Sequence, residues 1–155
     1  MKEQVVKSIS KLSCFDIQDV QKDDLERVMV KVLPKRKLGY FCPLCEKTSN
    51  SHSRGNYRVL RHDWVHDGQT LLVKVPLYRQ RCTTCNLTWT VKWEGIPERG
   101  QATEYYKRKV AEECILRSFG EVARDLNLPS STVGNWFNAY QEVHTGSKSP
   151  NLVNI

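Results

Sequence analysis

Apolar and polar residues alternate along much of the first two thirds of the chain, which is typical of β-strands with one buried face. The alternation covers residues 15–20, 25–33, 57–64, 69–81 and 87–93. Polar residues at 22–24 and a turn signal at 65–68 predict that the first four of these stretches form two hairpins. We expect residues 1–14 to be a short lead-in, and the run 46–56, rich in Ser and Asn, to be an exposed loop.

Helical spacing replaces the alternation in the last third of the chain. Apolar residues recur there every three or four positions. They predict three helices, at about 103–117, at about 119–127, and from Ser130 or Ser131 to about 142. Leu128 and Pro129 mark a tight turn between the second and third of these helices. The order predicts a helix-turn-helix, although three helices that pack together without any DNA function explain the same apolar spacing.

The predicted third helix has one apolar and one polar side. The residues expected to point inward are Val133, Trp136 or Phe137, and Tyr140. The opposite side carries short polar side chains, namely Ser131, Thr132, Asn135 and Asn138. Because Asn can form two hydrogen bonds with adenine in the major groove, this side is the candidate surface for contacts with DNA bases.

Two Cys-x-x-Cys pairs are the clearest chemical signal in the chain. They are Cys42-Pro43-Leu44-Cys45 and Cys82-Thr83-Thr84-Cys85, with 36 residues between them. Each pair places two thiolates on one tight turn, and two facing turns offer the tetrahedral set of sulfurs that Zn²⁺ accepts. We predict one structural zinc ion held by Cys42, Cys45, Cys82 and Cys85. Four thiolates leave no open coordination position for catalysis.

Two alternatives to zinc stay open at this point. A rubredoxin-like iron site uses similar ligands. Structural disulfides would need an oxidising compartment, yet the chain opens with Met-Lys-Glu-Gln and shows no apolar signal core, and Cys14 and Cys114 would lack an obvious partner. The histidines have no partner at zinc-finger spacing, so we expect them at the surface or beside phosphates. They are His52, His62, His66 and His144.

Together these patterns predict an α+β fold in which a β-rich zinc-binding module precedes a three-helix helix-turn-helix domain. We divide the 155 residues into five segments. These are an N-terminal lead-in and β-hairpin (1–40), the zinc-binding β module (41–94), a linker (95–102), the helix-turn-helix domain (103–142) and a flexible tail (143–155). Trp89 and Trp93 are expected in the core of the zinc module.

Positive charge is concentrated around the two cysteine pairs. Residues 34–109 carry fifteen Lys and Arg against six Asp and Glu, whereas residues 1–33 are balanced and residues 110–155 carry three against five. A basic surface of this density attracts the phosphates of nucleic acid, although a solvated basic face without a partner is the alternative. The candidate phosphate contacts are Arg58, Arg61, Arg79, Arg81, Lys107 and Arg108.

The order of these motifs resembles the N-terminal half of the ISL3-family transposases. In that family the cysteine pairs look like Cys-Pro-x-Cys-Gly and Arg-Arg-x-Arg-Cys-x-x-Cys, and a helix-turn-helix follows near Ser-x-x-Thr-Val. Here they read Cys42-Pro43-Leu44-Cys45-Glu46 and Arg79-Gln80-Arg81-Cys82-Thr83-Thr84-Cys85. Glu46 stands where the family favours Gly. The resemblance covers about residues 15–142 and implies binding to the terminal inverted repeats of a transposon.

The resemblance implies the DNA-binding half of such a transposase and not its catalytic half, which carries a DDE carboxylate triad in a further domain. A nuclease with two metal ions would need carboxylates that converge within a few ångströms. The carboxylates in or beside the basic module are Asp63, Asp67, Glu94 and Glu98, and nothing in the sequence predicts that they converge. We therefore expect a protein that is not an enzyme and has no small-molecule substrate.

The expected function is sequence-specific binding of double-stranded DNA, at transposon ends or operator-like sites, with homodimerisation left open. The alternative is a zinc-ribbon adaptor that docks on a larger nucleic-acid machine, with helices that only pack. No stretch is long and apolar enough to cross a bilayer. We expect no membrane partner and a cytoplasmic, nucleoid-associated location.

Overall fold

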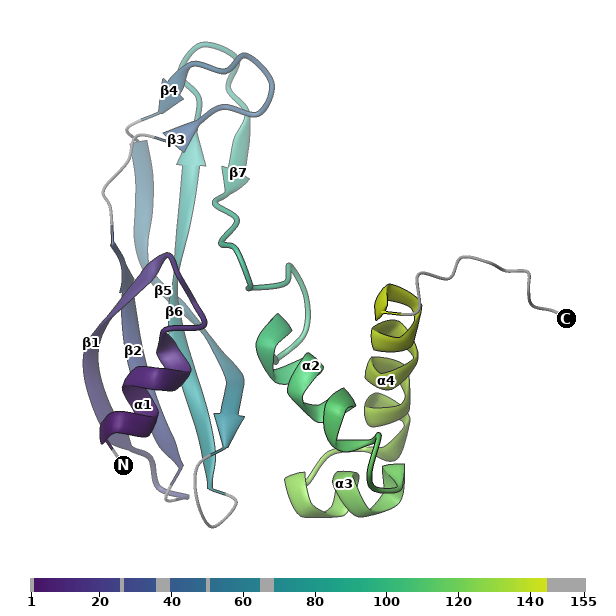
Figure 1. Ribbon diagram of the computed structural model, residues 1–155. Helices are drawn as coiled ribbons and strands as arrows, with labels where there is room; N and C mark the ends of the chain where they lie inside the picture. Colours follow the sequence, from purple (N-terminus) through teal and green to yellow (C-terminus); the bar gives the residue numbers. More distant parts are fainter. Residues whose placement is uncertain (1, 26, 36–39, 50, 65–68, 145–155) are drawn as a thin grey trace, which may run out of the picture. The chain divides into compact units, whose positions relative to one another are not determined.

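In the computed structural model, which describes residues 2–25, 27–35, 40–49, 51–64 and 69–144, the chain forms two units, residues 1–103 and 104–155. The first unit contains one helix and seven strands in its described part (Figure 1). They are α1 (Lys2–Ile9), β1 (Phe15–Lys22), β2 (Val28–Pro34), β3 (Tyr40–Phe41), β4 (Thr48–Ser49), β5 (Ser51–Trp64), β6 (Thr70–Arg81) and β7 (Thr88–Thr90). The second unit contains α2 (Glu104–Glu113), α3 (Phe119–Leu126) and α4 (Ser130–His144).

Five strands of the first unit form one mixed sheet. Its order is β1-β2-β6-β5, and β7 pairs with the end of β6. The pairs β1–β2 and β5–β6 are antiparallel hairpins, as the alternation predicts, but β2 pairs with β6 in the parallel direction. The short strands β3 and β4 form a separate antiparallel pair beside the ends of β5 and β6 (Figure 1).

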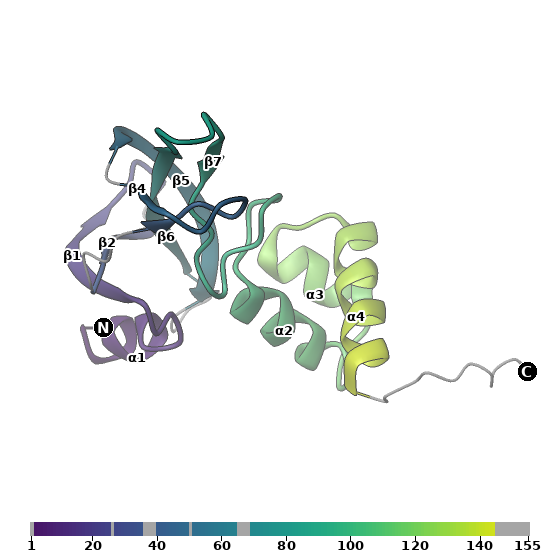
Figure 2. The ribbon, with the colours of Figure 1, turned by 90° about the horizontal axis from the view of Figure 1, so that it is seen from above.

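One face of the sheet buries its apolar side chains against α1, which lies across this face (Figure 2). The buried cluster combines Val5, Ile9 and Leu12 with Phe15, Val28, Val30, Val32, Leu60, Leu71, Val73 and Val75. Side chains on a strand point alternately to the two faces, so the regular Val-x-Val-x-Val pattern of β2 places three valines in this core. Each such side chain contributes about 1.5–3 kcal/mol when it is fully buried.

The predicted fold class is wrong, because the sheet core dominates the first unit and joins segments that the prediction had separated. The N-terminal hairpin is not a lead-in to a small zinc module, since β2 pairs directly with β6 and shares one core with it. The chain is a mixed α/β protein with a five-stranded sheet and, among the described residues, four helices. A parallel pairing between distant strands leaves no local signal in the sequence, so alternation alone could not reveal it.

Three further differences concern individual segments. Residues 2–9 form α1, whose Val5 and Ile9 enter the core, where only a lead-in was expected. The loop predicted at 46–56 is wrong, because β4 and the beginning of β5 lie there. The strand predicted at 87–93 is reduced to β7. The predicted turn at 65–68 and most of the predicted tail lie outside the described residues.

A buried polar network ties α1 to the sheet. His62 is fully buried, and its Nε2 lies 2.6 Å from the backbone oxygen of Ser8 while its Nδ1 lies 2.8 Å from Thr103 Oγ1. The hydroxyl of Ser8 donates to the carboxylate of Asp63, which also accepts from the Trp64 N–H at 2.8 Å. The expectation of a surface position for His62 is therefore wrong. A β-bulge between Arg61 and Asp63 interrupts the alternation of β5 at this point, where the consecutive residues His62 and Asp63 are both buried.

In the second unit, α4 packs against both α2 and α3. Ser118 caps the start of α3 through a capping box with Glu121, and the C-cap after Leu126 is Asn127, whose φ of 55° is left-handed. The ring centroids of Tyr106 and Trp136 lie 6.0 Å apart. This edge-on aromatic contact helps to fix how α2 and α4 pack against each other. No helix in the described part of the chain is both long enough and apolar enough to span a membrane.

Candidate metal centre

The two Cys-x-x-Cys turns have the same backbone hydrogen bonds. In the first turn the Glu46 N–H donates to the Cys42 carbonyl and the Cys42 N–H donates to the Lys47 carbonyl, both at 2.8 Å. In the second turn the Asn86 N–H donates to the Cys82 carbonyl and the Cys82 N–H donates to the Leu87 carbonyl, also at 2.8 Å. Each turn is thus closed on itself before any metal is considered, and its two sulfurs project from one compact loop.

The four sulfurs of these turns surround a common point. Cys42 Sγ lies 3.4 Å from Cys85 Sγ, and Cys45 Sγ lies 3.4 Å from Cys82 Sγ. The Sγ atoms of Cys45 and Cys85 are 3.9 Å apart, and all four ligand atoms lie within 4.8 Å of one another. A tetrahedral zinc ion with Zn–S bonds of about 2.3 Å would place its sulfurs about 3.8 Å apart. The cluster therefore fits a metal ion of this size.

The backbone prepares one of these thiols for ionisation. The N–H groups of Cys85 and Thr84 point at the Cys82 sulfur and lower the pKa of this thiol to about 6. At Cys85 the N–H of Leu87 also favours the thiolate, but the sulfur of Cys42, desolvation and the sulfurs of Cys82 and Cys45 together outweigh it and raise the pKa to about 12. Four thiolates at these distances repel one another, and a bound dication would stabilise all of them.

The remaining cysteines lie away from this cluster. Among the described residues, Cys42, Cys45, Cys82 and Cys85 are the group that could hold a metal ion, and none of the six cysteines forms a disulfide. Cys14 is half-buried at the edge of the sheet core, and burial raises the pKa of its thiol. Burial also raises the pKa of Cys114, at the end of α2.

The predicted phosphate contacts differ in how accessible they are. Arg79 and Arg81 are exposed, two residues apart on β6, directly before Cys82. One amino group of Arg81 lies 3.3 Å from Asn86 Oδ1 of the second cysteine turn. Arg61 is half-buried, and its backbone pairs with the segment 101–103. The two exposed arginines therefore flank the cysteine cluster.

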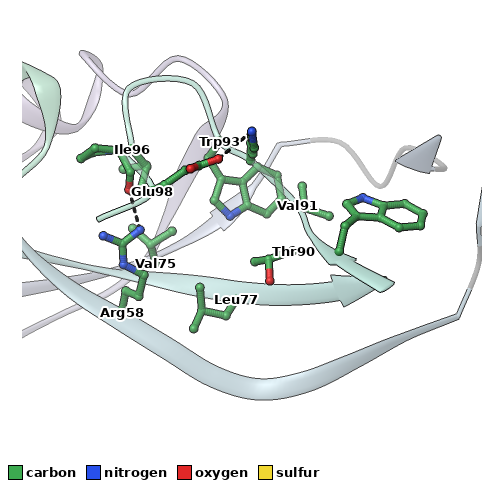
Figure 3. Close-up of a pocket in the computed structure, with 11 residues that line it drawn as sticks. Arg58, Val75, Leu77, Thr90, Val91, Trp93, Ile96 and Glu98 are labelled. Atoms are coloured by element: carbon green, nitrogen blue, oxygen red, sulfur yellow. Dashed lines mark hydrogen bonds and ion pairs between the residues drawn. The ribbon is translucent and has the colours of Figure 1, made fainter. Parts of the chain in front are cut away.

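Arg58 instead lines a pocket of about 430 Å³ in the first unit (Figure 3). Its guanidinium donates to the Pro97 carbonyl at 2.7 Å and to the Gly100 carbonyl at 2.8 Å. These two bonds hold the segment 97–100 against the sheet, so this part of the predicted linker is attached to the first unit. Arg58 thus has a structural partner, which sequence alone could not show.

The walls of this pocket are mainly apolar, with Val75, Leu77, Trp89, Trp93 and Ile96 among its lining residues. Trp93 packs edge-on against Phe15 with 5.2 Å between ring centroids, and its indole N–H donates to the Pro76 carbonyl at 3.1 Å. The expectation that Trp89 and Trp93 lie in the core of a zinc module holds only in part, because Trp93 is half-buried and packs against the sheet core, while Trp89 is half-buried and lines the pocket. On the rim, Lys92 and Glu98 form an ion pair at 2.6 Å (Figure 3), so these charges neutralise each other.

In the second unit, α4 presents its polar side chains outward. Ser131, Asn135 and Asn138 are exposed, and Thr132 is half-buried. The other side of α4 is anchored by Val133, which is fully buried, and by Phe137, whose ring lies 5.4 Å from that of Phe119. On α2, Arg108 is exposed, and Lys107 lies 3.6 Å from the carboxylate of Glu104.

Two of the four carboxylates considered for a nuclease are engaged elsewhere in the first unit. Asp63 is buried in the network with Ser8, and Glu98 pairs with Lys92. Glu94 is exposed, and Asp67 lies outside the described residues.

Comparison with known proteins adds no assignment, because no family model matches the chain and neither a curated protein nor a solved structure matches it significantly.

Proposed function

We propose that this chain is a zinc-stabilised protein that binds double-stranded DNA sequence-specifically, as the resemblance to the DNA-binding half of ISL3-family transposases implies, and that it carries no catalytic step of its own. The observation that carries the proposal is the polar outer side of α4. Ser131, Asn135 and Asn138 are exposed on this helix, while Val133 anchors its other side. Short polar side chains on one exposed helix face suit the base edges of the major groove.

The cysteine cluster has a structural role in this proposal. One zinc ion would hold Cys42, Cys45, Cys82 and Cys85, since the sulfur separations suit a tetrahedral site with four thiolates. Such a site is closed to substrate. The ion would fix the end of β6, where Arg79 and Arg81 are exposed and can contact phosphates.

Selection of bound duplexes from a random pool tests the proposal. We expect an enriched motif for the full chain, and we expect Asn135→Ala with Asn138→Ala to relax the preference at individual positions of that motif. Each lost bidentate contact should cost about 1–3 kcal/mol at the cognate base. Asn56→Ala removes an exposed Asn from β5 and is the matched control. No enriched motif, or an unchanged preference in the α4 variant, would contradict base recognition by α4.

A specific observation favours the adaptor function as a second candidate. Phe41 and Leu44 flank Cys42 and are 67% and 70% exposed, so the first cysteine turn displays apolar side chains to solvent. Exposed aromatic and aliphatic side chains are typical anchors of protein interfaces. A protein partner whose binding is lost in Phe41→Ser and Leu44→Ser, together with a selection that yields no motif, would favour this alternative.

A further inference from the structure

The same tripeptide occurs on two adjacent strands of the sheet. Val30-Lys31-Val32 lies in β2 and Val73-Lys74-Val75 lies in β6. The parallel register pairs Val30 with Val73 and Lys31 with Lys74. Since the valines of both strands point into the core, the two lysines point to the opposite face of the sheet. The fold therefore places two positive charges side by side on this face.

Both lysines contact one aromatic ring. The Nζ atoms of Lys31 and Lys74 lie 4.9 Å and 4.8 Å from the centroid of the Tyr57 ring. Tyr57 belongs to β5, the neighbour of β6 (Figure 1), and all three side chains are half-buried. We call these three residues the lysine pair site. The ring attracts both ammonium groups through its π-electrons, and this keeps both within 5 Å of one ring centroid.

This arrangement brings like charges together without an ion pair to either lysine in the described part of the chain. Like charges at directly paired positions of neighbouring strands destabilise a sheet. Asp19 is paired with Lys31 across β1 and β2, but its two oxygens accept from the Val20 N–H at 3.0 Å and from Gln21 Nε2 at 2.8 Å. The repulsion between the lysines is thus relieved only in part.

We propose that the lysine pair site binds phosphate groups of a nucleic-acid backbone. An anion that bridges the two ammonium groups offsets their repulsion, and the tyrosine keeps both in place before the anion arrives. Positions that break a rule of stability are often functional. The proposal rests on the proposed function, because it assigns the DNA a second, sequence-independent contact on the sheet, separate from α4.

Binding to a random-sequence duplex at several salt concentrations tests this site. We compare the full zinc-loaded chain with the double variant Lys31→Met and Lys74→Met, which keeps long, flexible side chains over the Tyr57 ring. The slope of log K against log salt is negative, and each lost phosphate contact reduces its magnitude by about 0.9. For the loss of two contacts we expect the magnitude of the slope to decrease by about 1.8. Because the variant also removes the repulsion, we expect its thermal midpoint in the absence of DNA to be equal to or above that of the wild type.

Lys7→Met with Lys35→Met is the matched control, since both lysines are exposed in the first unit and the net charge changes equally. We expect its slope to decrease by less than half as much. Equal slopes in the two double variants would overturn the proposal, because only net charge would then matter. An unchanged slope with a lowered thermal midpoint would also overturn it and leave the lysines a purely structural role. The absence of any binding of the wild type to the random duplex would overturn it as well.

The failure of this site and the failure of the proposed function give different results. The lysine pair site is tested on a random duplex, where base recognition by α4 makes no difference. If selection yields no motif while the salt slope depends on Lys31 and Lys74, the chain binds DNA without sequence preference. If selection yields a motif and the slope does not depend on them, α4 acts without this site.

Discussion

Glu46 and Asn86 adopt the same left-handed backbone conformation at equivalent positions, one residue after the second cysteine of each Cys-x-x-Cys turn. Their φ angles are 63° and 59°. The conformation aims each N–H at the carbonyl of the first cysteine of its turn, at 2.8 Å. Asn tolerates this conformation, but for most residues with a side chain it costs about 1–2 kcal/mol. The first turn therefore carries backbone strain that the second turn avoids.

We expect Glu46→Gly to stabilise the protein by about 0.5–1 kcal/mol. Glycine removes the strain at a positive φ, and the larger entropy of glycine in the unfolded chain offsets only part of this gain. Urea unfolding at saturating zinc measures the change in the free energy of unfolding. Lys47→Gly, at the next residue, should destabilise instead, and a destabilised Glu46→Gly would contradict the strain argument.

Removal of the metal should loosen the cysteine turns and leave the sheet core folded. We expect one zinc ion per chain by elemental analysis, and its loss in Cys82→Ser or after treatment with a chelator. Because binding energy at such a site is folding energy, residues 40–48 and 82–90 should then exchange their amide hydrogens faster. The centre of β2 and β6 should stay protected, since its core consists of apolar side chains that include those of α1.

Cys14→Ser is the control for the metal experiment, because Cys14 lies outside the cluster and the variant should retain one zinc ion. Wild-type protein that contains no metal and yet shows full protection of both cysteine turns would contradict the structural role of zinc. Iron in place of zinc would correct the identity of the ion and leave the role of the four sulfurs unchanged.

Local patterns predicted the elements whose signal lies within one segment. Alternation located the hairpins β1–β2 and β5–β6, and helical spacing located the helices at 104–113, 119–126 and 130–144 within a few residues. The spacing of two cysteines on one turn also depends only on local geometry, so the grouping of Cys42, Cys45, Cys82 and Cys85 was predictable. The period of side chains is a property of each element alone.

Contacts between distant segments could not be predicted in this way. The parallel pair β2–β6 determines the fold class, and it depends on a match between strands that lie far apart in the sequence. Arg58 appeared to be one basic residue among many, yet carbonyl oxygens of Pro97 and Gly100 fix its guanidinium. A lysine in the middle of each of two valine-rich strands was the available signal for the lysine pair site, but only the register shows that Lys31 and Lys74 meet.

Loss of the Thr103 hydroxyl should destabilise the first unit. A carbonyl oxygen can only accept, so His62 Nε2 donates to Ser8, and in a neutral imidazole Nδ1 then accepts from Thr103 Oγ1. Thr103→Val removes this donor and should lower the free energy of unfolding by about 1–3 kcal/mol. Thr103→Ser keeps the hydroxyl and is the control. Equal losses in the two variants, measured by urea unfolding at pH 7, would show that packing and not the hydrogen bond is responsible.

Asp23, in the turn between β1 and β2, should make the free energy of unfolding depend on pH in the acid range. Burial disfavours the charged form of this carboxyl, but the backbone N–H and the guanidinium of Arg27 outweigh this effect and lower its pKa. The Asp23 oxygens accept from the Leu25 N–H at 3.0 Å, the Arg27 N–H at 2.9 Å and Arg27 Nε at 2.7 Å. These bonds hold the turn between the two strands.

A carboxyl whose pKa is lower in the folded state stabilises the protein above its unfolded pKa of about 3.9, and this contribution is lost as the pH falls through the folded value. Asp23→Asn should therefore be less stable than the wild type at pH 7, and the difference should shrink at pH 3. Release of zinc in acid affects both proteins alike, so the difference between them isolates Asp23. Asp24→Asn, an exposed neighbour, should differ little from the wild type at either pH. A destabilisation by Asp23→Asn that is equally large at pH 3 and pH 7 would mean that the shape of the side chain, and not its charge, holds the turn.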